Sequence, residues 1–178
     1  MKPSALRLRR LTLSAILAAL TVVFLYIGAV VEVMDLTLAA MAALLVTFSR
    51  MEMGVKYAFM LYFAAGILSF LLLPSKLPAV LYLVMTGIYP ILKFRLERFR
   101  PLLSRVCKLA YFNAALTLVI WLTKFVLGLP DTGFSFELPV YLLGNVTYVL
   151  FDVALSMLIR SYQLTWRRRL RVQRFFGA

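Results

Sequence analysis

Residues 11–31 of the chain read LTLSAILAALTVVFLYIGAVV and follow a basic segment that contains Arg7, Arg9 and Arg10. The run has no charged side chain. As an α-helix it would be about 31 Å long, which matches the roughly 30 Å hydrocarbon core of a bilayer. It therefore predicts a membrane-spanning helix. The alternative is a signal peptide cleaved after Ala29, but the apolar region of a signal peptide is usually only about 7–15 residues long.

Five further apolar stretches follow the first one. They cover about residues 36–49, 55–73, 79–92, 109–128 and 139–159. The stretches 36–49 and 79–92 are short for a span, since about 20 residues are needed to cross the hydrocarbon core. Length alone therefore leaves the number of crossings open.

The distribution of lysine and arginine decides the number of crossings. If all six stretches cross, eighteen of the twenty cations lie on one side, and only Lys76 and Lys124 lie on the other. Cytoplasmic loops carry the excess of cations in membrane proteins. We therefore expect six spanning helices with both termini in the cytoplasm. Residues 160–178 would form a basic cytoplasmic tail that contacts anionic lipid.

The composition supports a membrane protein over a soluble one. Hydrophobic residues make up 63% of the 178-residue chain, against roughly 45–50% in soluble domains. The net charge of +13 could indicate a nucleic-acid binder, but such a protein needs a polar surface that this chain lacks. We expect an all-α membrane protein, a six-helix bundle in one domain, with membrane lipid and not nucleic acid as a partner.

Several kinds of chemistry are excluded by the residue types. The chain has no histidine and one cysteine, Cys107, which excludes the usual imidazole and thiolate metal sites, an internal disulfide and a histidine-dependent triad. It also has no Gly-x-x-x-x-Gly-Lys-Ser/Thr phosphate loop for ATP. We expect no enzymatic activity, no catalytic residue, no metal and no cofactor.

Polar and aromatic residues form a stripe on each of the last three predicted helices. Their spacings of three and four residues place each set on one helical face. The sets are Tyr82, Thr86, Tyr89 and Lys93; Asn113, Thr117, Trp121 and Lys124; and Tyr141, Asn145, Tyr148 and Asp152. Polar side chains are costly in lipid, so these faces are expected to meet one another or a cavity.

The outer part of these stripes is the predicted substrate site. Aromatic faces, amides and a cation in an apolar setting are typical of a small-molecule pocket. The predicted substrate-binding residues are Lys76, Tyr82, Thr86, Trp121, Lys124, Tyr141, Asn145 and Tyr148. The two outer lysines favour a ligand with a carboxylate or phosphate, and the aromatic residues favour a flat ring. An interfacial belt of aromatic residues is the alternative.

Asn113 and Asp152 are predicted to lie deeper, at about the same level, and to hydrogen-bond to each other. A carboxylate near the middle of a membrane costs roughly 2.5–3.5 kcal/mol on insertion scales. Asp152 could therefore make a structural hydrogen bond, relay protons or ions, or contact the substrate. In the fourth predicted helix, Gly87 and Pro90 are expected to bend the helix or loosen its hydrogen bonds.

The first helix carries small residues at helical spacing. Ser14 and Ala18, and Ala15 and Ala19, form two overlapping pairs four residues apart. Such pairs allow another helix to approach closely in lipid. The contact could be internal, or it could dock another subunit.

This six-helix layout, with a first helix that begins LTLSAILAAL, resembles the substrate-binding S component of energy-coupling factor (ECF) vitamin transporters. The resemblance implies that Ala15, Ala18 and Ala19, with Ser14 beside them, dock on a transmembrane T subunit that carries two ABC ATPases. It also implies a multi-pass protein of a prokaryotic-type cell membrane that binds a small vitamin-like ligand near the outer surface. Metal-specific members use N-terminal histidines, which this chain lacks, so nickel or cobalt uptake is disfavoured.

The sequence therefore predicts the substrate-capture subunit of an ECF-type ABC importer, in which partner subunits hydrolyse ATP. Two alternatives remain. One is a stand-alone secondary transporter or channel that uses Asp152 as its proton or ion site. The other is a membrane assembly factor with no transport role, in which the polar stripes only hold helices together.

Overall fold

The computed structural model describes residues 3–98, 100–126, 128 and 138–166 of the chain. Every regular element in this part of the chain is helical, as predicted. The main helices are α1 (Pro3–Val30), α2 (Asp35–Glu52), α3 (Val55–Leu72), α4 (Leu77–Leu81), α5 (Tyr89–Leu96), α6 (Pro101–Trp121) and α7 (Leu138–Ser161). The 3₁₀ turn η1 (Glu32–Met34) precedes α2, and the π-helical segments η2 (Tyr82–Thr86), η3 (Leu122–Val126) and η4 (Tyr162–Trp166) follow α4, α6 and α7.

Five helical segments are long and apolar enough to cross a membrane. They are Leu6–Val30, Val55–Leu72, Leu77–Leu96, Pro101–Phe125 and Leu138–Leu164. The chain is therefore a multi-pass membrane protein. The remaining predicted span, 36–49, corresponds to α2, which has 18 residues and is about 27 Å long. It carries Asp35, Arg50 and Glu52 close to its ends and is not among the five.

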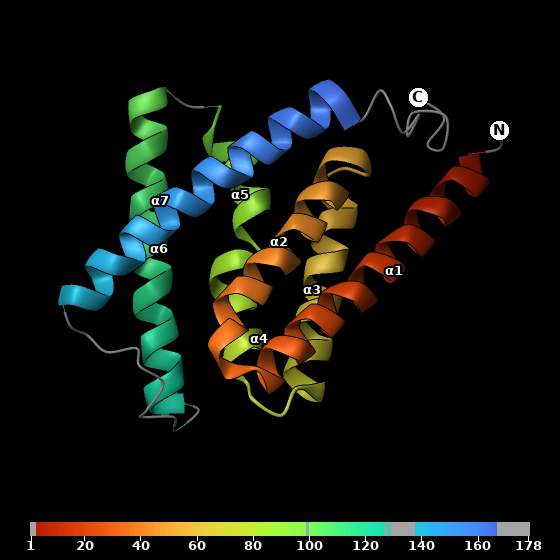
Figure 1. The fold of residues 1–178 in the computed structure, drawn as a ribbon. Coiled ribbons are helices and arrows are strands. Elements are labelled where there is room, and N and C mark those ends of the chain that lie inside the picture. The colour runs from red at the N-terminus through yellow and green to blue at the C-terminus, as the bar shows by residue number, and fades with distance from the viewer. Residues whose placement is uncertain (1–2, 99, 127, 129–137, 167–178) are drawn as a thin grey trace.

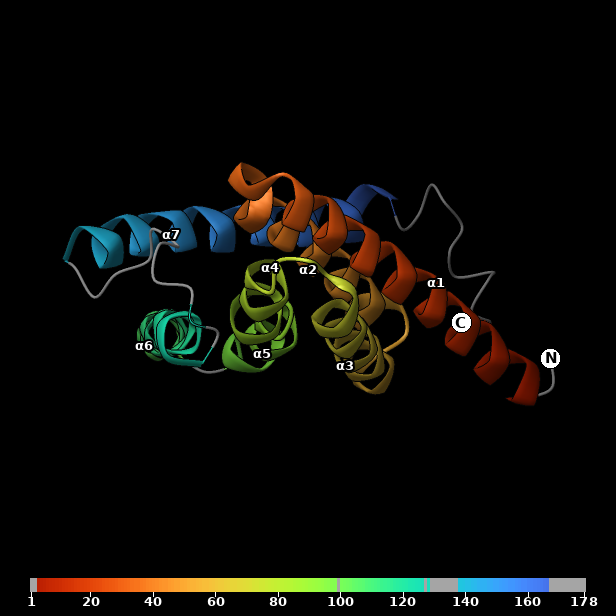
Figure 2. The ribbon, with the colours of Figure 1, turned by 90° about the horizontal axis from the view of Figure 1, so that it is seen from below.

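The helices form two layers. In Figure 2, α7, α2 and the C-terminal half of α1 lie in one layer, and α6, the α4–α5 segment and α3 lie in the other. Figure 1 shows that α7 runs obliquely across α6, while α2, α3 and the α4–α5 segment are closer to parallel. The N-terminal end of α1 projects beyond the other helices in both views.

The loops that connect the helices lie at two opposite ends of the bundle. Figure 1 places the first residues of α1, the α2–α3 turn, the α5–α6 turn and the last residues of α7 at the same end. Arg50, Lys56, Arg95 and Arg160 lie close to these points. The opposite end holds the α1–α2 and α3–α4 connections, including Lys76. Arg50, Lys56, Arg95 and Arg160 thus lie near one end of the bundle, and Lys76 lies at the other (Figure 1). Residues 167–178 of the predicted basic tail lie outside the described part, and helix continues from α7 through η4 to Trp166.

Small side chains bring α1, α2 and α3 close together. Ala39, Ala42 and Ala43 of α2 and Ala58 and Ala65 of α3 are completely buried. Small residues let helix backbones approach closely, and this packing is a main source of helix association in lipid. The resulting three-helix unit supports the α4–α5 segment, on which the candidate site is built.

The fourth predicted span is interrupted where Gly87 and Pro90 lie. The Gly87 N–H donates to the carbonyl of Tyr82, five residues earlier, over 2.8 Å. Proline has no N–H to donate and its ring crowds the preceding turn, so the regular helical bonding cannot continue through Pro90. The π-helical segment η2 results, and the predicted loosening of this helix is confirmed.

Two tyrosines from neighbouring helices satisfy carbonyl groups within η2. The Tyr62 hydroxyl donates to the carbonyl of Leu83 over 2.6 Å, and the Tyr111 hydroxyl donates to the carbonyl of Val84 over 2.7 Å. Irregular backbone at membrane depth is stable only when such groups find partners within the protein. These two bonds therefore fix the position of η2 between α3 and α6.

Candidate functional site

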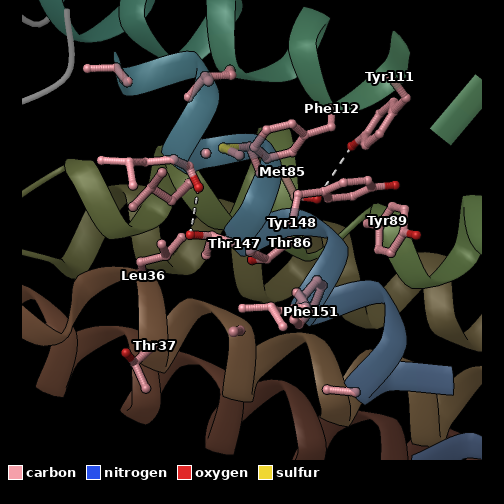
Figure 3. Close-up of a pocket in the computed structure, with 18 residues that line it drawn as sticks. Leu36, Thr37, Met85, Thr86, Tyr89, Tyr111, Phe112, Thr147, Tyr148 and Phe151 are labelled. Atoms are coloured by element: carbon pink, nitrogen blue, oxygen red, sulfur yellow. Dashed lines mark hydrogen bonds between the residues drawn. The ribbon is translucent and has the colours of Figure 1, made fainter. Parts of the chain in front are cut away.

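A cavity of about 620 Å³ lies between the two layers. Its walls come from α2, the α4–α5 segment, α6 and α7. Figure 3 shows Leu36 and Thr37 of α2 on one side and the aromatic residues of α5, α6 and α7 on the other. The volume falls within the roughly 300–1,000 Å³ typical of small-molecule sites.

Five aromatic side chains line the cavity: Tyr89, Tyr111, Phe112, Tyr148 and Phe151. The rings of Phe112 and Tyr148 stack at 4.5 Å between centroids, with 21° between their planes. Tyr89 is the hub of the group, since its ring contacts those of Tyr111, Tyr148 and Phe151 at 5.3–6.0 Å. Such contacts make a rigid aromatic wall.

Two buried hydroxyls of the cavity wall, those of Thr86 and Tyr148, have no hydrogen-bond partner in the structure. The Thr86 side chain lines the cavity and is only 6% exposed, and its Oγ1 atom has no hydrogen-bond partner in the structure. A helical threonine usually bonds to a carbonyl three or four residues earlier, as Thr117, Thr123 and Thr147 do. The π-helical geometry of η2 accompanies the loss of that bond at Thr86. A buried hydroxyl without a partner is costly, so a ligand atom at this point would stabilise the site.

A cluster of four charged residues lies beside the aromatic wall. Lys93, which is completely buried, forms ion pairs with Asp152 and, at 3.1 Å, with Glu97. Lys108 reaches the same two acids, with 2.9 Å to Glu97 and 3.2 Å to Asp152. The Nζ atom of Lys93 also donates to Ser156 Oγ over 2.8 Å. The positive charges of the two lysines equal the negative charges of the two carboxylates, so the cluster has no net charge.

Glu97 lies at the open edge of this cluster, at the end of α5. Burial would raise the pKa of its carboxyl, but hydrogen bonds and attraction from Lys108 and Lys93 outweigh that effect and hold the pKa below its usual range. The Glu97 carboxylate therefore stays ionised and bridges the two lysines. It completes the cluster of Lys93, Lys108, Glu97 and Asp152, which joins α5, α6 and α7 and is called the charged clamp below.

The polar faces of α6 and α7 meet, as predicted, but with a different pairing. The side-chain amides of Asn113 and Asn145 exchange two hydrogen bonds of 3.0 Å each. The hydroxyls of Thr117 and Tyr141 lie 2.9 Å apart and share a third bond. The prediction that Asn113 pairs with Asp152 is wrong, because Asp152 is bound by Lys93, Lys108 and Tyr89.

Only two of the eight predicted substrate residues, Thr86 and Tyr148, line the cavity. Tyr82 is buried against Tyr62, and Tyr141 and Asn145 are bonded to α6. Lys76 donates to the carbonyl of Leu73 in the α3–α4 turn, over 2.7 Å. Trp121 is half exposed, and neither it nor Lys124 lines the cavity.

The sequence pattern did not identify several residues of this region. Phe112 and Gly144 line the cavity, but an apolar residue and a glycine carry no sign of a binding site. Lys108 lies just outside the predicted span 109–128, yet α6 begins at Pro101 and places it two turns inside the helix. A residue that was already suspected, Tyr89, turns out to join the cavity to the charged cluster.

The small residues of α1 face two directions. Ser14 and Ala18 are buried, and the Ser14 hydroxyl lies 3.5 Å from the sulfur of Met53. Ala15 and Ala19 lie on the exposed face of the helix. The predicted docking set of four is therefore divided: one pair packs inside the protein, and the other is accessible to a partner helix.

Within the described residues, no three histidine, cysteine, aspartate or glutamate side chains lie together as a potential metal site. Comparison of the chain with protein-family models, with curated proteins and with solved structures finds no match. The function must therefore be argued from the sequence and from the geometry of the site.

Proposed function

We propose that the protein is the substrate-capture subunit of a multi-subunit membrane importer of the ECF type. The observation that carries the proposal is the cavity among α2, the α4–α5 segment, α6 and α7, with an unpartnered Thr86 hydroxyl in its wall. Helix-bundle membrane proteins build ligand sites between their helices, and such sites combine apolar walls with few polar groups. The cavity is where the captured molecule would bind.

The proposal also assigns the exposed pair Ala15 and Ala19 as the docking face for the T subunit. The two residues lie on one face of α1, four residues apart, with Ile16, Leu8 and Val23 exposed nearby. Small residues flanked by large apolar ones let a partner helix approach closely. Under the proposal, two ABC ATPases bound to that T subunit supply the energy for import.

Co-purification with partner subunits tests the proposal. The tagged protein, solubilised in mild detergent from its native host, is expected to retain a membrane subunit and ABC ATPases. Ala15→Trp and Ala19→Trp should abolish this capture without changing the thermal unfolding temperature, because both positions are exposed. Ala110→Trp, at an exposed position on α6, is the matched control and should capture partners normally. If neither alanine variant affects capture, or if wild type captures no ATPase, the proposal fails.

A stand-alone carrier is the second candidate, because the Asp152 carboxylate contacts Tyr89 of the cavity wall. It predicts uptake by the purified protein alone in liposomes, and loss of that uptake in Asp152→Asn. The balanced charges of Lys93, Lys108, Glu97 and Asp152 argue against it, since a relay carboxylate must gain and lose its proton readily. Uptake that requires the ATPases and ATP would reject the carrier.

A further inference from the structure

We infer that the cavity takes an uncharged, flat and largely aromatic molecule that presents one hydrogen-bonding group to Thr86. The inference rests on the proposed function, because it names the class of molecule that the cavity captures. It also departs from the expectation that Lys76 and Lys124 attract a carboxylate or phosphate. Neither lysine lines the cavity.

The charge state of the ligand follows from the walls. The described residues that line the cavity include no aspartate, glutamate, lysine, arginine or histidine, and the tyrosine hydroxyls among them are neutral at pH 7. The charged groups beside the aromatic wall, Lys93, Lys108, Glu97 and Asp152, bind one another. An anion or cation in the cavity would lose its hydration without gaining a counter-charge, which is strongly unfavourable. A neutral molecule avoids this loss.

The shape of the ligand follows from the aromatic wall. The Tyr148 ring contacts the rings of Tyr89 and Phe112 on one side of the cavity, and Leu36 lies on the opposite side (Figure 3). Aromatic rings pack best against other rings, in offset or edge-to-face geometry. A lipid acyl chain could fill an apolar space, but it has no polar atom to offer the Thr86 hydroxyl. The unpartnered Oγ1 atom therefore favours a ring compound with a carbonyl or hydroxyl group.

Photolabelling with a matched pair of probes tests this inference. The probes are 9,10-anthraquinone, which is flat and neutral with carbonyl acceptors, and anthraquinone-2-carboxylate, which adds one negative charge. Each is irradiated with the purified full chain in lipid nanodiscs, and the labelled peptides are identified by mass spectrometry. The neutral probe should label the peptides that contain Thr86, Phe112 and Tyr148, and the carboxylate should not label them.

Three variants test whether the probe labels the protein from within the cavity. A Cβ atom at Gly144 would already lie 3.2 Å from Leu116 Cδ2, so Gly144→Leu should fill the space and remove the label. Ala154→Phe, at an exposed position that lines the cavity, is a second blocking variant that is less disruptive to helix packing. Thr86→Val keeps the shape but removes the hydroxyl, and the probe concentration for half-maximal labelling should rise about two- to tenfold.

The outcomes separate this inference from the proposed function. Equal or stronger cavity labelling by the carboxylate overturns the inference, as does labelling that both blocking variants leave unchanged. A phospholipid found in the cavity by native mass spectrometry, with no anthraquinone label there, also overturns it. Capture of the partner subunits is measured without any probe, so it can fail while cavity labelling succeeds, or succeed while the carboxylate binds best.

Discussion

The hydroxyl of Tyr89 donates a hydrogen bond to the carboxylate of Asp152, and the ring of the same tyrosine lines the cavity. One side chain therefore contacts both the candidate ligand site and the charged clamp that joins α5, α6 and α7. A ligand that moves the Tyr89 ring must also disturb the Asp152 hydrogen bond. The binding site and the packing of the last three helices are thus physically coupled.

The two roles of Tyr89 can be separated by substitution. Tyr89→Phe keeps the aromatic wall but removes the bond to Asp152, so it should lower stability by about 1.5–3 kcal/mol and leave anthraquinone labelling nearly unchanged. Tyr89→Ala should reduce both. Thermal unfolding in detergent and the labelling assay measure the two effects. If Tyr89→Phe abolishes labelling with unchanged stability, the hydroxyl serves the ligand and not the clamp.

The charged clamp should depend on Asp152 more than on any neutral group in it. Asp152→Asn leaves the buried Lys93 with too little compensating charge, and breaking such a pair typically costs about 3–5 kcal/mol. Ser156→Ala, which removes a neutral partner of the same lysine, should cost only about 1 kcal/mol. The double variant Lys93→Met with Asp152→Asn should recover part of the loss, because Lys108 and Glu97 still pair. A double variant less stable than Asp152→Asn would contradict this account.

Sequence reasoning predicted the helical elements well because hydrophobic length and charge act locally along the chain. The basic residues around Arg50 and Arg95 were enough to suggest that the short stretches 36–49 and 79–92 run between the same two ends as the long ones. The structure extends both stretches, to Asp35–Glu52 and to Leu77–Leu96. Gly87 and Pro90 also predicted the loosened helix correctly, since their effect on the backbone is intrinsic.

The pairing of side chains could not be predicted in the same way. The prediction that Asn113 and Asp152 lie at equal depth assumes parallel helices with a rise of 1.5 Å per residue, but α7 crosses α6 obliquely (Figure 1). Asn113 therefore meets Asn145, which lies two turns before Asp152 in α7. The cavity itself depends on where Phe112, Gly144 and Leu36 come together from three helices. No local pattern in the sequence predicts how these three helices come together.

Gly87 should tolerate substitution poorly. A Cβ atom there would lie 2.7 Å from the Tyr82 ring and 2.8 Å from the Tyr82 carbonyl oxygen. Gly87→Ala should therefore cost about 1–3 kcal/mol through overpacking. Gly28→Ala is the control, since its Cβ would meet its nearest neighbour at an ordinary 3.5 Å, and it should be neutral or slightly stabilising. Equal unfolding temperatures for the two variants would show that η2 relaxes without cost.

The reciprocal amide pair between Asn113 and Asn145 should show measurable coupling. Asn113→Leu and Asn145→Leu each leave one amide without its partner, whereas the double variant removes both. A double-mutant cycle on stability in detergent should give a coupling energy of about 0.6 kcal/mol, with about 1.7 kcal/mol as the upper end for membrane proteins. Thr147→Val, which alters an exposed hydroxyl of α7 that bonds only within its own helix, should show no coupling to Asn113→Leu. Strict additivity of the two asparagine variants would mean that water or lipid replaces the pair.

Glu97 gives the clamp a defined dependence on pH. Its pKa in the folded protein is held below the ordinary value of 4.5 by Lys108 and Lys93. A group with a depressed pKa stabilises the folded state above its unfolded-state pKa and loses that contribution as the pH falls through its folded-state pKa. Wild type should therefore be more stable than Glu97→Gln at pH 7, and the gap between their unfolding temperatures should close as the pH is lowered below about 4. Asp152 is present in both proteins, so the difference between them reports on the Glu97 carboxylate. A gap that stays constant from pH 7 to pH 3 would show that Glu97 contributes packing and not charge to the clamp.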